Sequence, residues 1–229
     1  MAEHDIAAAI NATTQQIRDL ELQYDRQPGS VTLLAVSKTK PATAIRAAYD
    51  AGHREFGENF VEEGVRKREE LQLADSSWHF IGAIQSNKTA TIAEHFDWVH
   101  GIDREKIARR LSSQRPAHLP PLNCCIQVNP DGETSKAGLP PESVAALCDA
   151  IAGLPNIRLR GLMTIPAPRQ DVNAQREVFR QIAQLQSQLR SQFDQLDTLS
   201  MGMSADMEAA IAEGATIVRI GTALFGSRK

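Results

Sequence analysis

Two patterns of apolar residues alternate along the chain. Short runs rich in aliphatic and aromatic residues are too short for typical helices, and each ends near Gly, Pro, Asn or Asp. These runs predict strands at residues 31–36, 54–59, 78–82, 98–102, 122–128, 159–165, 196–200 and 216–221. Between them, apolar residues spaced three or four apart predict helices. Eight strands that alternate with helices are typical of a (β/α)8 TIM barrel, which is an α/β fold.

The first 28 residues precede this alternation. Ile6, Ile10, Ile17, Leu20 and Tyr24 are spaced by three, four or seven residues, which predicts an amphipathic helix from about residue 4 to 25. We expect residues 1–28 to pack on the barrel as an extra helix. No Gly/Ser-rich linker interrupts the chain, so residues 1–229 are expected to form a single domain. A doubly wound open sheet is the alternative, although no G-x-G-x-x-G turn follows the first strand.

Three residues are expected to begin helices that follow strands. Pro41 precedes a helical pattern at 42–49, and Asp103 is expected to cap a basic helix after the fourth strand. Ser204 is expected to begin a helix at 204–213. Each of these helices would start at the carboxyl end of a strand, which is where barrels carry their active sites.

Charge and composition favour a small-molecule ligand. Lys and Arg total 25 against 28 Asp and Glu, so the net charge is −3 and no pole of charge is present. Neither nucleic acid nor an anionic membrane is supported as a partner. No segment approaches 18 uninterrupted apolar residues, and the segment from Met1 to Asp5 has no basic or apolar signal region. We expect a cytoplasmic monomer.

Cysteines and histidines do not indicate a disulfide framework or a metal site. Cys124 and Cys125 are adjacent and Cys148 is distant, so we expect reduced, buried thiols. The six histidines lack an H-x-x-x-H spacing, so no metal is predicted. His79, between two aromatic residues, is interpreted as a hydrogen-bonded core histidine.

Lys38 stands at the carboxyl end of the first predicted strand. An amine at the rim of an apolar strand loses part of its hydration and becomes a better nucleophile toward a carbonyl. This is the chemistry of a lysine that forms a Schiff base. The alternative is that Lys38 only ends the strand with a solvated charge, and this stretch alone does not decide between the two.

The last two strands offer a phosphate site and a buried cation. Gly221 and Thr222 follow the eighth strand, and Ser204 follows the seventh, where barrels often bind phosphate. The alternative for Ser204 is an ordinary helix N-cap. Arg219 lies among apolar residues of a buried strand, so its guanidinium needs either a structural carboxylate or the ring nitrogen of a heterocycle. Lysine, phosphate site and arginine together indicate pyridoxal 5'-phosphate (PLP).

Six motifs resemble the PLP homeostasis proteins, the YggS/PROSC family. They are AVSKTK at 35–40, FGEN at 56–59, WHFIG at 78–82 with QSNK at 85–88, GLM at 161–163, SMGMSAD at 200–206 and VRIGT at 218–222. The resemblance runs from the first strand to the last. It implies a barrel similar to the N-terminal domain of alanine racemase, with a role in vitamin B6 homeostasis and without an established catalytic turnover.

The resemblance also implies positions for the cofactor. PLP would be held as an internal aldimine on Lys38, its phosphate near Ser204, Gly221 and Thr222, and its ring nitrogen facing Arg219. Asn59 and Ser200 would line the same pocket. PLP would be the small-molecule partner, with apo PLP enzymes as possible recipients.

The sequence does not decide between two other classes of function, nor does it decide the roles of three further lysines. A PLP-dependent amino-acid racemase needs a second acid or base, whereas Tyr24 and Tyr49 are expected on helices away from the mouth of the barrel. A Schiff-base aldolase would use Lys38 but leave Arg219 without a role. Lys40 and Lys88 are expected to be solvated, with secondary PLP binding as the alternative. Lys136 falls in the segment 129–138, whose Pro-Asp-Gly turn departs from the family pattern and leaves a role of Lys136 in PLP exchange open.

Overall fold

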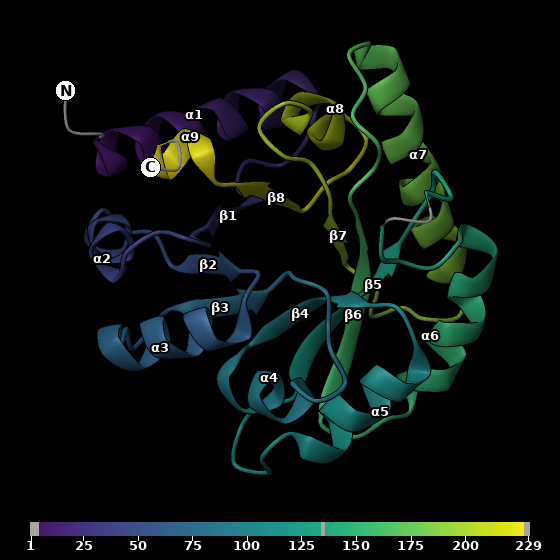
Figure 1. Cartoon of the computed structure of the whole chain (residues 1–229). Helices are drawn as coiled ribbons and strands as arrows, with labels where there is room; N and C mark the ends of the chain where they lie inside the picture. The colour runs from purple at the N-terminus through teal and green to yellow at the C-terminus, as the bar shows by residue number, and fades with distance from the viewer. Residues whose placement is uncertain (1–4, 134–135, 227–229) are drawn as a thin grey trace.

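The strands of the protein close into a barrel. A computed structural model describes residues 5–133 and 136–226. Each strand is parallel to its neighbours, in sequence order, and the last pairs with the first, so the sheet has no free edge (Figure 1). The strands are β1 (Thr32–Val36), β2 (Glu55–Glu58), β3 (Ser77–Phe80), β4 (Trp98–Ile102), β5 (Leu122–Val128), β6 (Ile157–Thr164), β7 (Thr198–Ser200) and β8 (Ile217–Ile220). The predicted (β/α)8 barrel is confirmed, and the open sheet is excluded.

Helices surround the barrel and follow its strands (Figure 1). They are α1 (Ile6–Gln23), α2 (Ala42–Asp50), α3 (Val61–Leu71), α4 (Thr89–His95), α5 (Glu105–Gln114), α6 (Val144–Ala152), α7 (Val172–Leu189), α8 (Met207–Ala212) and α9 (Thr222–Phe225). A 3-10 turn (Pro141–Ser143) leads into α6. The extra helix α1 begins where Asp5 accepts a hydrogen bond from Ala8 N at 3.0 Å. It lies against α8 and α9, beside β1 and β8.

Two predicted helix starts are wrong. Arg104, not Asp103, precedes the first residue of α5, and the Asp103 carboxylate instead pairs with the Arg104 guanidinium at 2.8 Å. Helix α8 begins at Met207 rather than at Ser204, because Asp206 accepts a hydrogen bond from Met203 N at 2.6 Å and closes a turn first. In both places a local contact of an aspartate carboxylate, with the Arg104 guanidinium or with the Met203 amide, replaces the predicted helix start.

The apolar core and the polar interior of the barrel are separate. Large apolar side chains such as Phe56, Trp78 and Phe96 are fully buried between the strands and the helices. By contrast, His100 on β4 hydrogen-bonds Ser200 on β7 at 2.8 Å. Since β4 and β7 are not neighbours in the sheet, this bond crosses the inside of the barrel. The hydrophobic core therefore stabilises the outer layer, and the inside is available for polar chemistry.

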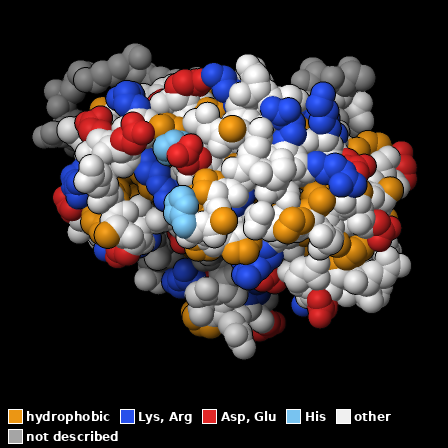
Figure 2. All heavy atoms as spheres, turned by 90° about the horizontal axis from the view of Figure 1, so that it is seen from below, with side chains coloured by type: hydrophobic (Ala, Val, Ile, Leu, Met, Phe, Trp, Pro, Cys, Tyr) orange, Lys and Arg blue, Asp and Glu red, His pale blue; other side chains and the backbone are white. Residues whose placement is uncertain are grey.

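The surface carries both signs of charge. On the face shown in Figure 2, basic and acidic side chains are intermixed, with apolar side chains between them. In the described part of the chain, no helix is long and apolar enough to cross a membrane.

Candidate cofactor-binding site

Lys38 lies in a tight turn directly after β1. The turn is closed by a hydrogen bond from Lys40 N to Ser37 O at 3.0 Å, so Lys38 and Thr39 are its central residues. Thr39 has φ +63°, a left-handed conformation that costs a β-branched residue about 1–3 kcal/mol. Its amide donates to Glu63 Oε1 at 2.6 Å. The position of Lys38 is therefore set by a strained backbone turn that a carboxylate on α3 holds in place.

A buried ion cluster supports this turn from behind. Lys67 Nζ on α3 donates to Ser37 O at 2.7 Å and to Glu58 Oε1 on β2 at 2.8 Å, and it also pairs with Glu63 at 2.7 Å. Ser37 Oγ donates to the same Glu58 oxygen at 2.6 Å. The Lys67 and Glu58 side chains are completely buried. Burial raises the pKa of Glu58, although the nearby Lys67 charge opposes this change.

This cluster was not predicted from the sequence, although the pattern of α3 contains it. The buried positions of the helix are Val61, Gly64, Lys67 and Leu71, so a lysine stands in the stripe that faces the barrel. A charged residue at a core position of an amphipathic helix requires a buried partner. From this requirement, the buried carboxylate that β2 carries could have been predicted.

The Lys38 turn and the end of β8 line one small cavity. Its volume is about 40 Å³, and it is lined by Val36, Lys38, Thr39, Lys40, Gly221, Thr222 and Gly226. A side chain at position 221 would bring its Cβ within 3.2 Å of Val36 O, so glycine allows the two segments to approach closely. Lys40 Nζ donates to Gly226 O at 2.8 Å and so bridges the same segments. The structure therefore brings together three of the predicted residues: Lys38, Gly221 and Thr222.

Arg219 is buried on β8, and its acceptors are a hydroxyl and two carbonyls rather than a carboxylate. Nη1 donates to Ser200 O at 2.6 Å and to Ser200 Oγ at 2.9 Å, and Nη2 donates to Thr164 O at 2.8 Å. Burial lowers the pKa of Arg219 to about 10, so the side chain stays charged at neutral pH. These bonds use three of the five N–H groups of a guanidinium. Among the described residues, the other two have no acceptor.

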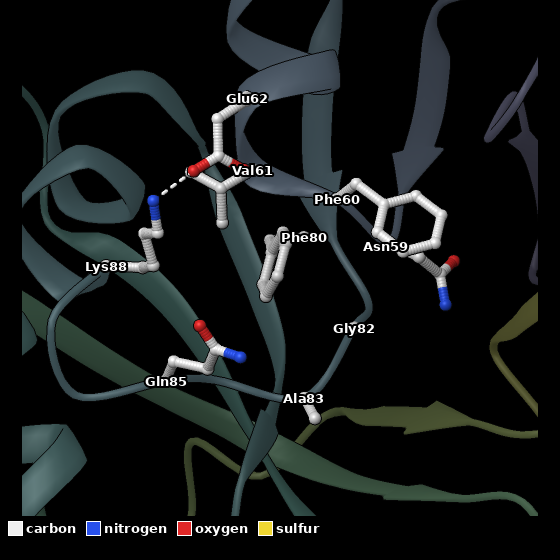
Figure 3. A pocket seen from close by; sticks show the side chains of 9 residues that line it. All are labelled: Asn59, Phe60, Val61, Glu62, Phe80, Gly82, Ala83, Gln85 and Lys88. Atoms are coloured by element: carbon white, nitrogen blue, oxygen red, sulfur yellow. Dashed lines mark hydrogen bonds and ion pairs between the residues drawn. The ribbon is translucent and has the colours of Figure 1, made fainter.

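Asn59 follows β2 and lines a second, larger cavity of about 360 Å³. Figure 3 shows this cavity between the start of α3, the end of β3 and the loop before α4. Lys88 lies on its rim and pairs with Glu62, so this lysine is engaged. Asn59 Oδ1 is buried and has no partner in the described part of the chain. A Cβ at Gly82 would lie 2.3 Å from Asn59 O, so glycine is required for the loop to pass Asn59.

Ser204 is not among the residues that line these two cavities. It is exposed in the turn between β7 and α8, and it does not cap the helix as expected. Asp206 takes that position, and burial raises the pKa of its carboxyl group. Ser200, the last residue of β7, contacts Arg219 directly.

Lys136 belongs to a loop that is held by its own residues. Asn129 Nδ2 donates to Glu133 O at 2.9 Å, and Lys136 pairs with Glu133 at 2.9 Å. Residues 134 and 135 of the same predicted segment lie outside the described residues. The exchange role considered for Lys136 stays a prediction.

The fold and the site together define a class of protein. A closed (β/α)8 barrel carries a lysine after its first strand and a buried arginine on its last, and residues 9–229 match the family described as "Alanine racemase, N-terminal domain". The alanine racemase of Corynebacterium glutamicum is similar with a TM-score of 0.69 and 16% identity, over 97% of this chain and 61% of that chain. This likeness shows the fold alone.

Closer relatives define the family within that class. A Pseudomonas aeruginosa protein named pyridoxal phosphate homeostasis protein is 57% identical over 223 residues, or 97% of this chain and 96% of the relative. The structure of PipY from Synechococcus elongatus PCC7942 with PLP bound has a TM-score of 0.85 and 39% identity, and the match covers 96% of this chain and 100% of PipY. The chain belongs to the family of pyridoxal phosphate homeostasis proteins.

Proposed function

We propose that this protein binds PLP, holds it covalently through Lys38, and serves as a reserve of the cofactor in vitamin B6 homeostasis. The observation that carries the proposal is the meeting of Lys38 with Gly221 and Thr222 around one cavity. Membership of the family and the PLP complex of PipY support it. Attachment requires the Lys38 amine to condense with the aldehyde of PLP, which forms a C=N bond and releases one water.

The polar groups of the site fit the chemistry of PLP. Arg219 retains two N–H groups without a protein acceptor among the described residues, and a pyridine nitrogen is an acceptor. The buried amide of Asn59 likewise keeps unused hydrogen-bonding capacity. Backbone amides and the Thr222 hydroxyl after β8, with Ser204 after β7, are proposed to bind the phosphate. Ser200 contributes by holding Arg219.

An arginine at the ring nitrogen favours storage over catalysis. When bound, PLP supplies an aldehyde for amines and a ring that can accept electrons. Arg219 is always a donor, so it would keep the ring nitrogen unprotonated and weaken that electron sink. We propose that the protein has no robust catalytic turnover.

Neither tyrosine of the chain lines the Lys38 cavity, where the racemase alternative would need a second acid or base. The two tyrosines of the chain are engaged elsewhere: Tyr24 hydroxyl donates to Glu208 Oε1 at 2.9 Å, and Tyr49 hydroxyl bonds Asp75. Tyr24 directly follows the last residue of α1, and Tyr49 lies on α2, so both belong to the outer layer of helices. We therefore propose low-level racemisation only as the second candidate function. We also propose that the protein is a cytoplasmic monomer and that it passes PLP to apo PLP enzymes.

The visible spectrum of the purified protein tests the proposal first. The protein is expected to be yellow or to become yellow with added PLP, and borohydride is expected to abolish the band and leave a pyridoxyl group on Lys38 in peptide maps. Lys38→Ala should lose the band, and Lys106→Ala, which removes an exposed lysine from α5, should keep it. A colourless wild type that takes up no PLP would overturn the proposal and favour the aldolase alternative.

A further inference from the structure

An unbroken chain of side-chain hydrogen bonds runs through the inside of the barrel. It starts at Arg219, which donates to Ser200 Oγ at 2.9 Å, and continues from Ser200 Oγ to His100 Nδ1 at 2.8 Å. His100 Nε2 lies 2.9 Å from His79 Nδ1, and His79 Nε2 lies 2.7 Å from Glu55 Oε2. The chain thus connects β8, β7, β4, β3 and β2 and ends at a carboxylate that is one-third exposed.

The arginine end of the chain fixes the direction of each hydrogen bond. A guanidinium only donates, so Ser200 Oγ accepts from Arg219, and among the described residues His100 Nδ1 is the acceptor that the Ser200 proton can reach. Complete burial lowers the pKa of His100 well below its ordinary value, so this imidazole is neutral. A neutral imidazole that accepts at Nδ1 carries its proton on Nε2. His100 therefore donates to His79.

The carboxylate end is compatible with the same direction. Burial favours the uncharged form of Glu55, but its hydrogen bonds, first with His79 and then with Ser77, outweigh burial and lower the pKa of Glu55. An ionised carboxylate accepts only, so His79 Nε2 must donate to it. His79 Nδ1 is then free to accept from His100. The opposite direction would leave the Ser200 proton without an acceptor among the described residues, which is unfavourable in a buried site.

We propose that His100, His79 and Glu55 are positioning residues for the cofactor. They hold the Ser200 hydroxyl as a fixed acceptor, and this acceptor fixes the guanidinium of Arg219 that is proposed to meet the ring nitrogen of PLP. The inference rests on the proposed function, since it concerns how the same site holds its ligand. None of the three residues belongs to the predicted binding set, and all act through Ser200 and Arg219.

The direction of the chain is tested without any cofactor. In the PLP-free protein labelled with ¹⁵N-histidine, long-range ¹H–¹⁵N correlation spectra are expected to show His100 neutral, with its proton on Nε2. A His100 ring protonated on Nδ1, or on both nitrogens at neutral pH, would overturn the inference. This result does not depend on whether PLP binds.

The effect on the cofactor is tested with a graded pair of variants. His100→Leu removes both hydrogen bonds, whereas His100→Asn retains an oxygen that can accept from Ser200 but is too short to reach His79. We expect the dissociation constant for PLP to rise about tenfold in His100→Leu and about threefold in His100→Asn, and the absorption maximum of bound PLP to shift in His100→Leu. His95→Asn, a matched change on α4 away from the chain of hydrogen bonds, should leave both unchanged.

The outcomes separate the inference from the proposed function. A yellow wild type with unchanged affinity and spectrum in His100→Leu would overturn the positioning role and leave PLP binding intact. A wild type that takes up no PLP would overturn both the proposed function and the cofactor half of the inference. Circular dichroism of each variant confirms folding, and His100→Asn provides the comparison if His100→Leu fails to fold.

Discussion

Lys67 is the residue whose replacement tests most directly how the Lys38 turn is held. Lys67→Met keeps the length and apolar stem of the side chain but removes its charge and its bonds to Ser37, Glu58 and Glu63. Glu58 then remains in a fully buried place without its cation. Removal of one partner from a buried pair costs about 3–5 kcal/mol. We therefore expect the free energy of unfolding to fall by about that amount at neutral pH.

The cost of this substitution should depend on pH in a defined direction. Burial already raises the pKa of Glu58 in the folded state, and loss of the Lys67 charge raises it further. A group whose pKa is higher in the folded state stabilises the fold below its unfolded pKa, about 4.3 for Glu, and loses that contribution as the pH rises. The variant should therefore be less destabilised at pH 5 than at pH 8. Each tenfold increase in the proton affinity of the folded-state carboxylate widens this difference by about 1.4 kcal/mol.

Urea unfolding followed by circular dichroism at pH 5 and pH 8 measures both effects. Arg66→Met is the matched control, because it removes an exposed cation from the same helix whose pair with Glu70 spans 3.7 Å. This control should change stability by less than about 0.5 kcal/mol. In the double variant Glu58→Gln/Lys67→Met the pH dependence should disappear. A loss below about 1 kcal/mol in Lys67→Met at both pH values would refute the account of the cluster.

Burial and close contact give two further predictions. The three cysteines are buried, and burial raises the pKa of Cys125 and of Cys148 to about 12. Ellman's reagent at pH 8 should therefore modify no thiol before the protein unfolds. Prompt reaction of any of the three thiols would contradict this expectation. Gly82→Ala should lower the midpoint of thermal unfolding by several degrees, because the added Cβ would lie 2.3 Å from Asn59 O. Gly153→Ala should be tolerated, because no atom lies within 4 Å of its added Cβ. Equal midpoints for the two variants would contradict this prediction.

The order of strands and helices could be predicted because each strand of a barrel is apolar on the face that meets the helices. Leu122–Val128 is buried along almost its whole length, and its run of apolar residues gave the bounds of β5 correctly. Helix starts were harder, because Asp and Ser compete for backbone amides over a range of a few residues. At 204–206 the carboxylate of Asp206 accepts the Met203 amide, and the helix starts later than Ser204 suggested.

The residues proposed to bind the cofactor could be predicted from the sequence, but the residues that hold them in place could not. Lys38 and Arg219 stood out because a charge beside or within an apolar run needs a chemical reason. The link from His79 to His100 depends on how β3 and β4 align, where His79 lies opposite Trp98, and no local pattern gives that register. His79 was correctly interpreted as a hydrogen-bonded core histidine, but its partners lie on strands distant in sequence.

Closure of the barrel requires that β8 has been synthesised. β1 pairs with β8, and Arg26, just after α1, donates to Ile211 O at 3.1 Å, so both depend on residues that are synthesised after the first seven strands. Until then β1 has an unpaired edge and α1 lacks the surface formed by α8 and α9. A nascent chain that stops before β8 therefore exposes an apolar strand edge, which makes it a target for chaperones and prone to aggregation. The β1–β8 pairing therefore protects only a chain that already contains β8.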